Sequence, residues 1–231
     1  MKNTGNSGGQ PIEWYLERIA YLSGFMTPER EQVLRNVIAD RTRYMTVCME
    51  NTYYAHNASA LIRHCDAFGI QDIHTVETLC KFDPSTDVVR GSDKWVTFHR
   101  HKTTPEAVAD LRAGGYRIVA TTPHMGDTTP EGFDVAAGPF ALVFGTEKDG
   151  ISPEMVEAAD EFLRIPMWGF VESLNISAAA AIIMYMLSGR LRGSAAEWQL
   201  PEYEKAEILF RWMARTIRGS AKILQRFEEL K

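Results

Sequence analysis

The stretch from Pro166 to Leu187, PMWGFVESLNISAAAAIIMYML, constrains the fold more than any other part of the chain. A polar turn that holds Ser173 and Asn175 is followed by ten consecutive apolar residues, from Ala178 to Leu187. That run is too short to cross a bilayer whose core is about 30 Å thick, so it predicts a buried helix. Ser and Asn ordinarily cap helix starts, and a polar turn above a buried helix is also a place that can hold a ligand.

Composition limits the class of protein. A chain of 231 residues, 45% of them hydrophobic, can bury a core in one domain with extensions or in two small domains. Its net charge of −5 argues against binding nucleic acid over the whole surface, although a local basic face remains open. Cys48, Cys65 and Cys80 lack CxxC spacing and indicate reduced thiols in the cytoplasm. Without an apolar leader or a long apolar run, we expect no membrane partner.

Short apolar runs alternate with helical patterns in the middle of the chain, which predicts an α/β fold with a parallel sheet flanked by helices. The expected strands are residues 44–50, 72–76, 95–99, 116–121, 140–144 and 162–165. Thr27-Pro28, Thr104-Pro105 and Ser152-Pro153 each predict a helix start, since Thr and Ser cap helices and Pro suits the first turn.

We expect three segments along the chain. Residues 1–43 form a disordered tail followed by helices, residues 44–193 form the α/β domain, and residues 194–231 form a C-terminal helical extension. Basic residues alternate with apolar ones in this extension, which predicts an amphipathic helix pair broken near Gly219. The pair either presents its charge to RNA or only packs on the domain.

Two further basic clusters are candidates for contact with phosphate. The first lies around the second N-terminal helix and contains Arg30, Arg35, Arg41 and Arg43. The second is HRHK, residues 99–102, at the end of a predicted strand. A run like the arginine cluster is usually an ordinary solvated surface, and the cluster at residues 99–102 fits a solvated strand exit as well as it fits RNA contact.

Ligands of open α/β sheets bind beyond the carboxyl ends of the strands, where three polar loops are expected at residues 51–57, 145–152 and 167–175. The second loop, GTEKDGIS, has the spacing of a nucleotide-binding phosphate loop, but Ile151 stands where that loop needs lysine. The GxGxxG pattern of dinucleotide-binding proteins is also missing. These observations argue against a nucleoside triphosphatase and a dinucleotide-dependent enzyme.

Three segments, NASALIRHCDAFGI, ALVFGTEKDGIS and IPMWGFVESLNISAAAAI, resemble in this order the three motifs of the SPOUT superfamily of RNA ribose methyltransferases. TPER and SDKWV, which begin at Thr27 and Ser92, are similar to the tRNA (guanosine-2′-O)-methyltransferase branch, usually called TrmH. The resemblance implies a C-terminal trefoil knot that binds S-adenosylmethionine, and a homodimer with its site near the interface. It also implies methylation of a ribose 2′-hydroxyl in RNA, with a guanosine of the tRNA D-loop as the expected target. Ribosomal RNA as the substrate, and a non-catalytic RNA-binding member of the fold, remain alternatives.

Matching the motifs residue by residue, the resemblance implies that Asn57, Arg63, Glu147, Ser173 and Asn175 form the catalytic site. A guanidinium, whose pKa exceeds about 12, accepts protons poorly at neutral pH. We therefore expect Arg63 to hold the neighbouring phosphate and to stabilise the developing alkoxide. The alternative is an ordinary ion pair between Arg63 and a nearby carboxylate such as Glu147.

For the methyl donor, the resemblance points to Thr121, Gly145, Ile165, Met167 and Leu174, with Gly145 allowing close approach of the backbone. Considered one at a time, the apolar residues of this set (Ile165, Met167 and Leu174) are more typical of a protein core than of a cofactor site. Methyl transfer from a sulfonium needs no metal, and we expect no metal site from the spacing of His and Cys residues.

Overall fold

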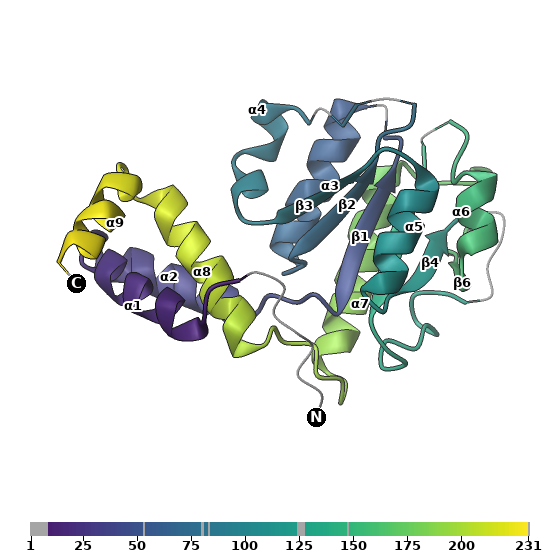
Figure 1. Ribbon diagram of the computed structural model, residues 1–231. Coiled ribbons are helices and arrows are strands. Elements are labelled where there is room, and N and C mark those ends of the chain that lie inside the picture. Colours follow the sequence, from purple (N-terminus) through teal and green to yellow (C-terminus); the bar gives the residue numbers. More distant parts are fainter. Residues whose placement is uncertain are drawn as a thin grey trace. The chain divides into compact units, whose positions relative to one another are not determined.

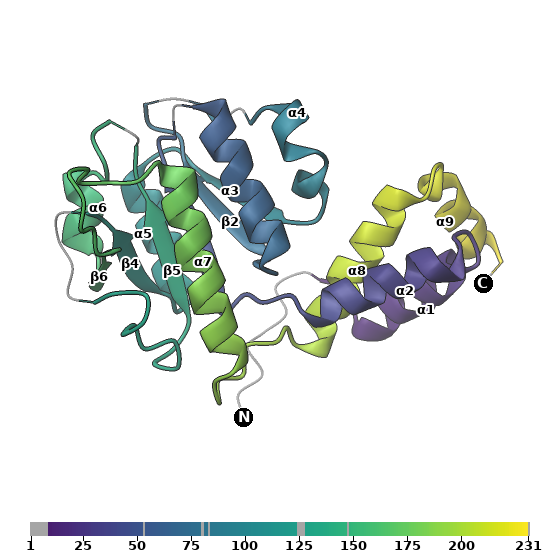
Figure 2. The ribbon, with the colours of Figure 1, turned by 180° about the vertical axis from the view of Figure 1, so that it is seen from behind.

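The computed structural model describes residues 9–52, 54–79, 81–82, 84–123, 128–146 and 148–230, and the predicted tail therefore lies largely outside the described residues. The chain forms two compact units (Figures 1 and 2). One unit runs from Thr42 to Gln199. The other joins the two ends of the chain, up to Arg41 and from Leu200 onward. The helical segments that the sequence suggested as two separate extensions are thus parts of one unit.

The unit from Thr42 to Gln199 is built on a six-stranded parallel sheet, as predicted, with the strand order β3-β2-β1-β5-β4-β6. The strands are β1 (Met45–Glu50), β2 (Asp72–Val76), β3 (Thr97–His101), β4 (Arg117–Thr121), β5 (Phe140–Phe144) and β6 (Glu161–Leu163). The largest difference from the prediction is at β3, which begins two residues later than expected. Ser92–Lys94 form a short 3-10 turn that ends at Trp95 and delays the strand.

Helices cover both faces of the sheet. They are α3 (Ala55–Ala67), α4 (Thr86–Val89), α5 (Thr104–Ala113), α6 (Pro153–Ala158) and α7 (Ile176–Arg192). α3 and α7 lie on the face seen in Figure 2, and α5 and α6 lie on the face seen in Figure 1. Because side chains alternate along a strand, Val47 packs with the α3 and α7 core, while Cys48 packs with the core of α5 and α6.

The predicted buried helix is α7, but only one of its sides is buried. Ile183, Met184 and Leu187 have at most 1% of their surface exposed, whereas Tyr185 is 69% exposed. The apolar composition of α7 therefore does not mean that every side of the helix is buried. None of the helices formed by the described residues is both long and apolar enough to span a membrane.

Polar side chains cap several helix starts, because the first backbone N–H groups of a helix have no partner inside it. Ser152 Oγ accepts from the Met155 N–H at 3.2 Å, as its pairing with Pro153 predicted. The α5 cap lies one residue earlier than predicted: Thr103 Oγ1 accepts from the Glu106 N–H.

The unit formed by the chain ends contains α1 (Ile12–Ser23), α2 (Pro28–Ala39), α8 (Glu202–Thr216) and α9 (Ser220–Glu229). The predicted break near Gly219 is present, since this glycine has a φ of 76° and separates α8 from α9. The core of the unit includes Leu22, Leu34, Ile38, Ile208 and Trp212.

Two of the arginines suggested for phosphate contact have structural roles instead. Arg41 is fully buried, with its guanidinium 5.2 Å from the centre of the Trp212 ring. Arg43 forms an ion pair of 2.9 Å with the buried Asp72. The phosphate hypothesis is therefore wrong for Arg41, which no phosphate can reach, while Arg43 is already paired with a carboxylate.

Candidate active site

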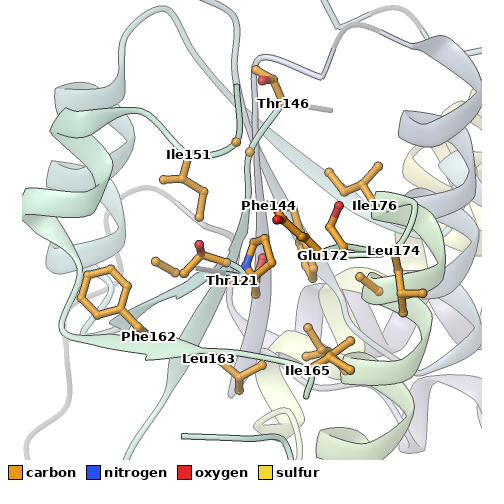
Figure 3. Close-up of a pocket in the computed structure, with 18 of the residues that line it drawn as sticks. Thr121, Phe144, Thr146, Ile151, Phe162, Leu163, Ile165, Glu172, Leu174 and Ile176 are labelled. Carbon is orange, nitrogen blue, oxygen red and sulfur yellow. The ribbon is translucent and has the colours of Figure 1, made fainter. Parts of the chain in front are cut away.

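A cavity of about 630 Å³ opens at the carboxyl ends of β4, β5 and β6, where ligands of parallel sheets bind. Figure 3 shows Ile151 and Phe162 on one side of it, with Ile165 and Leu174 on the other. Its walls come from the segments that follow the three strands and from the first turns of α7. The lining combines apolar side chains such as Phe144 with polar ones such as Thr121, and sites for small organic ligands use both kinds.

The loop after β5 is closed by its own backbone. The Thr146 N–H donates to the Gly150 carbonyl at 2.7 Å, and the Gly150 N–H donates back to the Thr146 carbonyl at 3.2 Å. Gly145 lies beneath this closure: a Cβ placed there would meet the Gly150 carbonyl group at 2.2 Å and the Ile151 nitrogen at 2.4 Å. The chain's own backbone therefore requires glycine at position 145.

All five residues suggested for the methyl donor, Thr121, Gly145, Ile165, Met167 and Leu174, line this cavity. Thr121 also has a local role, because its hydroxyl donates to the Val143 carbonyl at 2.7 Å and joins the ends of β4 and β5. The structure therefore brings the whole donor set to one place, although its members lie in three separate segments of the sequence.

The first and third motifs meet at Asn57 and Asn175. The Asn175 Nδ2 donates to Asn57 Oδ1 at 3.4 Å, and Asn175 Oδ1 accepts from the Ser177 N–H at 2.8 Å. Asn175 thus caps α7, as predicted, and also contacts α3. Ser173 and Asn175 both line the cavity, whereas Glu147 lies outside the described residues.

Arg63 lies on α3 with its side chain exposed, and it is not among the residues that line the cavity. Within the described part of the chain, its guanidinium donates one long hydrogen bond, of 3.4 Å, to the Val88 carbonyl. A bond of that length is weak, so most of the donors of this guanidinium face solvent.

His64 is a residue near the candidate site that the sequence did not single out. Burial lowers the pKa of its ring, and the positive charge of the neighbouring Arg63 lowers it further. A hydrogen bond with the backbone of Ser177 raises the pKa and so opposes part of this shift. A neutral His64 therefore lies between Arg63 and the first turn of α7. The sequence signal that could have identified His64 was its position directly after Arg63 in the first motif.

The segments around the cavity are supported by a buried carboxylate, Glu50, at the end of β1. It accepts hydrogen bonds from Thr104 Oγ1 at 2.6 Å, from Ser152 Oγ at 2.7 Å and from the Ser152 N–H at 2.9 Å. Its charge faces the start of α5 and of α6, where helix dipoles favour an anion. Burial and this carboxylate raise the pKa of Cys48. A glutamate ending an otherwise apolar strand was the sequence signal for this support.

Comparisons with known proteins give one consistent result. A family model for the SpoU rRNA methylase family matches residues 44–185. The tRNA (guanosine(18)-2′-O)-methyltransferase of Borreliella burgdorferi is 36% identical to this chain over 204 residues, which cover 88% of this chain and 93% of that protein.

Solved structures agree with the sequence comparison. The Aquifex aeolicus TrmH/SpoU tRNA modifying enzyme aligns with a TM-score of 0.72 and 32% identity, over 82% of this chain and 97% of that one. The SpoU methyltransferase AviRb from Streptomyces viridochromogenes, solved in complex with the cofactor AdoMet, aligns with a TM-score of 0.57 and 30% identity. That match covers 69% of this chain and 62% of AviRb.

Proposed function

Because this chain belongs to the SpoU rRNA methylase family, we propose that it transfers the methyl group of S-adenosylmethionine to the 2′-hydroxyl of a guanosine in the D-loop of tRNA. The observation that carries the proposal is the convergence of the three motifs: Asn57 of the first contacts Asn175 of the third, and both lie beside the cavity closed by the Gly145 loop of the second. The trefoil knot of the family is part of this proposal.

The cavity fits S-adenosylmethionine in size and in chemistry. Its volume of about 630 Å³ lies within the range of about 300–1,000 Å³ that is usual for ligand sites. Ile165 and Leu174 offer apolar surface for an adenine ring, while Lys148 and Glu172 bring charges of both signs. When bound, the cofactor supplies an electrophilic methyl group on a sulfonium.

The residues of this chain then have to position the ribose and to help the hydroxyl lose its proton. We assign Arg63 to the phosphate beside the target ribose and to the alkoxide that develops there, since its guanidinium is exposed and weakly engaged. Asn57 and Asn175 hold the turn between the cavity and α7, and Ser173 on that turn faces the cavity. Glu147 completes the proposed set.

The helices α8 and α9 carry both an apolar side that packs and exposed basic residues, the two features that the sequence suggested for the C-terminal segment. Their apolar residues pack in the unit formed by the chain ends, among them Trp212 and Met213. Basic side chains exposed on the same segment are Arg215, Arg218, Lys222 and Arg226. We propose that these contact tRNA phosphates. We place the reaction in the cytoplasm, which fits the buried, reduced thiols of Cys48 and Cys65.

We also propose that a second copy of the chain covers the exposed side of α7. Large apolar side chains are exposed there and on the turn before it, including Trp168, Phe170, Ile182 and Tyr185. Patches of this kind mark interfaces with other proteins. Replacing Ile182 with Lys and Tyr185 with Glu together is expected to turn a dimer into a monomer in analytical ultracentrifugation.

The matched control for this surface is Val33→Glu on α2, which removes an apolar side chain of comparable exposure, 49%, and should leave the mass unchanged. A wild-type protein that sediments as a monomer at micromolar concentration contradicts the dimer proposal. So does a double variant that remains a dimer.

The proposed activity is tested by incubating the protein with labelled S-adenosylmethionine and separate pools of tRNA and ribosomal RNA. We expect label in tRNA, recovered as 2′-O-methylguanosine from the D-loop. Label confined to ribosomal RNA selects the alternative substrate. Binding of RNA without any transfer of label selects a non-catalytic member of the family.

A further inference from the structure

A cluster of histidine and aspartate side chains lies at the β3 edge of the sheet, on the face covered by α5. It contains His74 of β2, His101 at the end of β3 and Asp110 of α5. Strands β1 and β5 separate β2 from β4, so this cluster is distinct from the cavity beside β4, β5 and β6. The proposed methyl transfer uses none of these three residues.

The three side chains point one polar atom each at a common space. His74 Nδ1 lies 3.1 Å from His101 Nε2, and Asp110 Oδ2 lies 3.5 Å and 3.6 Å from these two nitrogens. Zn²⁺ ligands lie about 2.0–2.1 Å from the ion, and tetrahedral geometry then places them about 3.3 Å apart. The triangle formed by the three atoms therefore already has nearly the size that a single ion requires.

We propose that His74, His101 and Asp110 bind one divalent transition-metal ion, with Zn²⁺ as the favoured ion. Two imidazoles and one carboxylate are a ligand set that zinc commonly takes in proteins, with water in the fourth position. The side chain of His74 is 5% exposed and that of Asp110 is 49% exposed, so solvent reaches the site from the α5 side.

The surroundings of the three residues suit an ion. The His99 ring stacks on His74 with their centres 4.6 Å apart, and its Nε2 faces Asp72 at 3.5 Å instead of the common space. Stacking restricts the rotation of the His74 ring and keeps Nδ1 directed at the site. Burial, with His99 and His101 nearby, lowers the pKa of His74 to about 4, so the ring is neutral at pH 7, as a metal ligand must be.

The ion would join β2, β3 and α5, three elements that are held here mainly by backbone bonds and packing. Its expected effect is therefore on stability, since binding to the native state alone stabilises that state. The spacing of His and Cys residues predicted no metal site, and residues 99–102 were expected to form a basic cluster that contacts either phosphate or solvent. One of its histidines, His101, acquires its partners only from β2 and α5.

The test uses untagged protein freed of metal with a chelator and dialysed, to which Zn²⁺ or Co²⁺ alone is added. Calorimetry is expected to show one ion per chain, and bound Co²⁺ should give the visible absorption of a tetrahedral site. Loss of a residue that only supports a ligand typically costs about 10–100-fold in metal affinity, so loss of a ligand itself, in Asp110→Asn or His101→Gln, should weaken binding at least about 10-fold. Zn²⁺ should raise the melting temperature of the wild type more than that of Asp110→Asn.

His56→Gln is the matched control, because it removes an exposed histidine of α3, which lies on the face of the sheet opposite α5. It should leave the affinity unchanged. Asp110 is half exposed, so its Asn variant should keep the fold, which circular dichroism without metal verifies. Absence of binding, or equal binding by the wild type and both cluster variants, overturns the proposal and leaves His74 and His101 as a hydrogen-bonded pair.

Discussion

Replacing Arg63 with alanine is expected to lower the rate of methyl transfer by about 10²–10³, the usual loss when one preorganised charge is removed from a reacting centre. The affinity for S-adenosylmethionine should stay nearly unchanged, because Arg63 does not line the cavity. Single-turnover kinetics measures the first quantity and calorimetry measures the second.

Arg63→Lys separates charge from geometry. Lysine keeps the positive charge but lacks the planar fork that binds two phosphate oxygens at once, so we expect it to be nearly as inactive as alanine. Arg112→Ala, which removes an exposed arginine of α5 on the face of the sheet opposite α3, is the matched control and should retain most of the rate. A lysine variant with most of the wild-type rate shows that charge alone suffices, and the phosphate-clamp role is then wrong.

The variant Gly145→Ala is expected to act on the donor cavity. Its Cβ would lie 2.2 Å from the Gly150 carbonyl group, so the loop from Gly145 to Ile151 cannot keep its closed form. Displacements of about 1 Å at a reacting centre can cost on the order of 10² in rate, and here the affinity for the donor should fall as well. The pattern is the reverse of Arg63→Ala, which spares donor binding.

Gly193→Ala provides the matched control for this loop. Its Cβ would meet only ordinary contacts, the nearest at 3.7 Å, so donor affinity and rate should both persist. Unchanged donor binding by Gly145→Ala would show that the loop is not part of the donor site.

Much of the fold could be predicted because its signals are local. Apolar runs marked the six strands to within a few residues, and capping residues before proline marked the starts of α2 and α6. Strand order could not be predicted in this way, since β1 pairs with β5 across a long stretch of chain. Neighbours that are distant in sequence are set by the packing of the whole sheet.

The same limit applies to individual side chains. Arg41 and Arg43 looked like solvated basic residues, but Trp212 and Asp72, far along the chain, enclose or pair with them. The Asn57–Asn175 contact spans 118 residues. The motifs named these two residues without showing that they touch, and only the packing of α3 against α7 brings them together.

The most direct test of the central claim is methyl transfer to two tRNAs that differ by one atom, the 2′-oxygen of the target guanosine in the D-loop. The protein is expected to methylate the tRNA that carries this hydroxyl, while the 2′-deoxy tRNA should bind comparably and accept no label. Incorporation of label into the 2′-deoxy tRNA at the same rate would contradict the assignment of the ribose hydroxyl as the methyl acceptor.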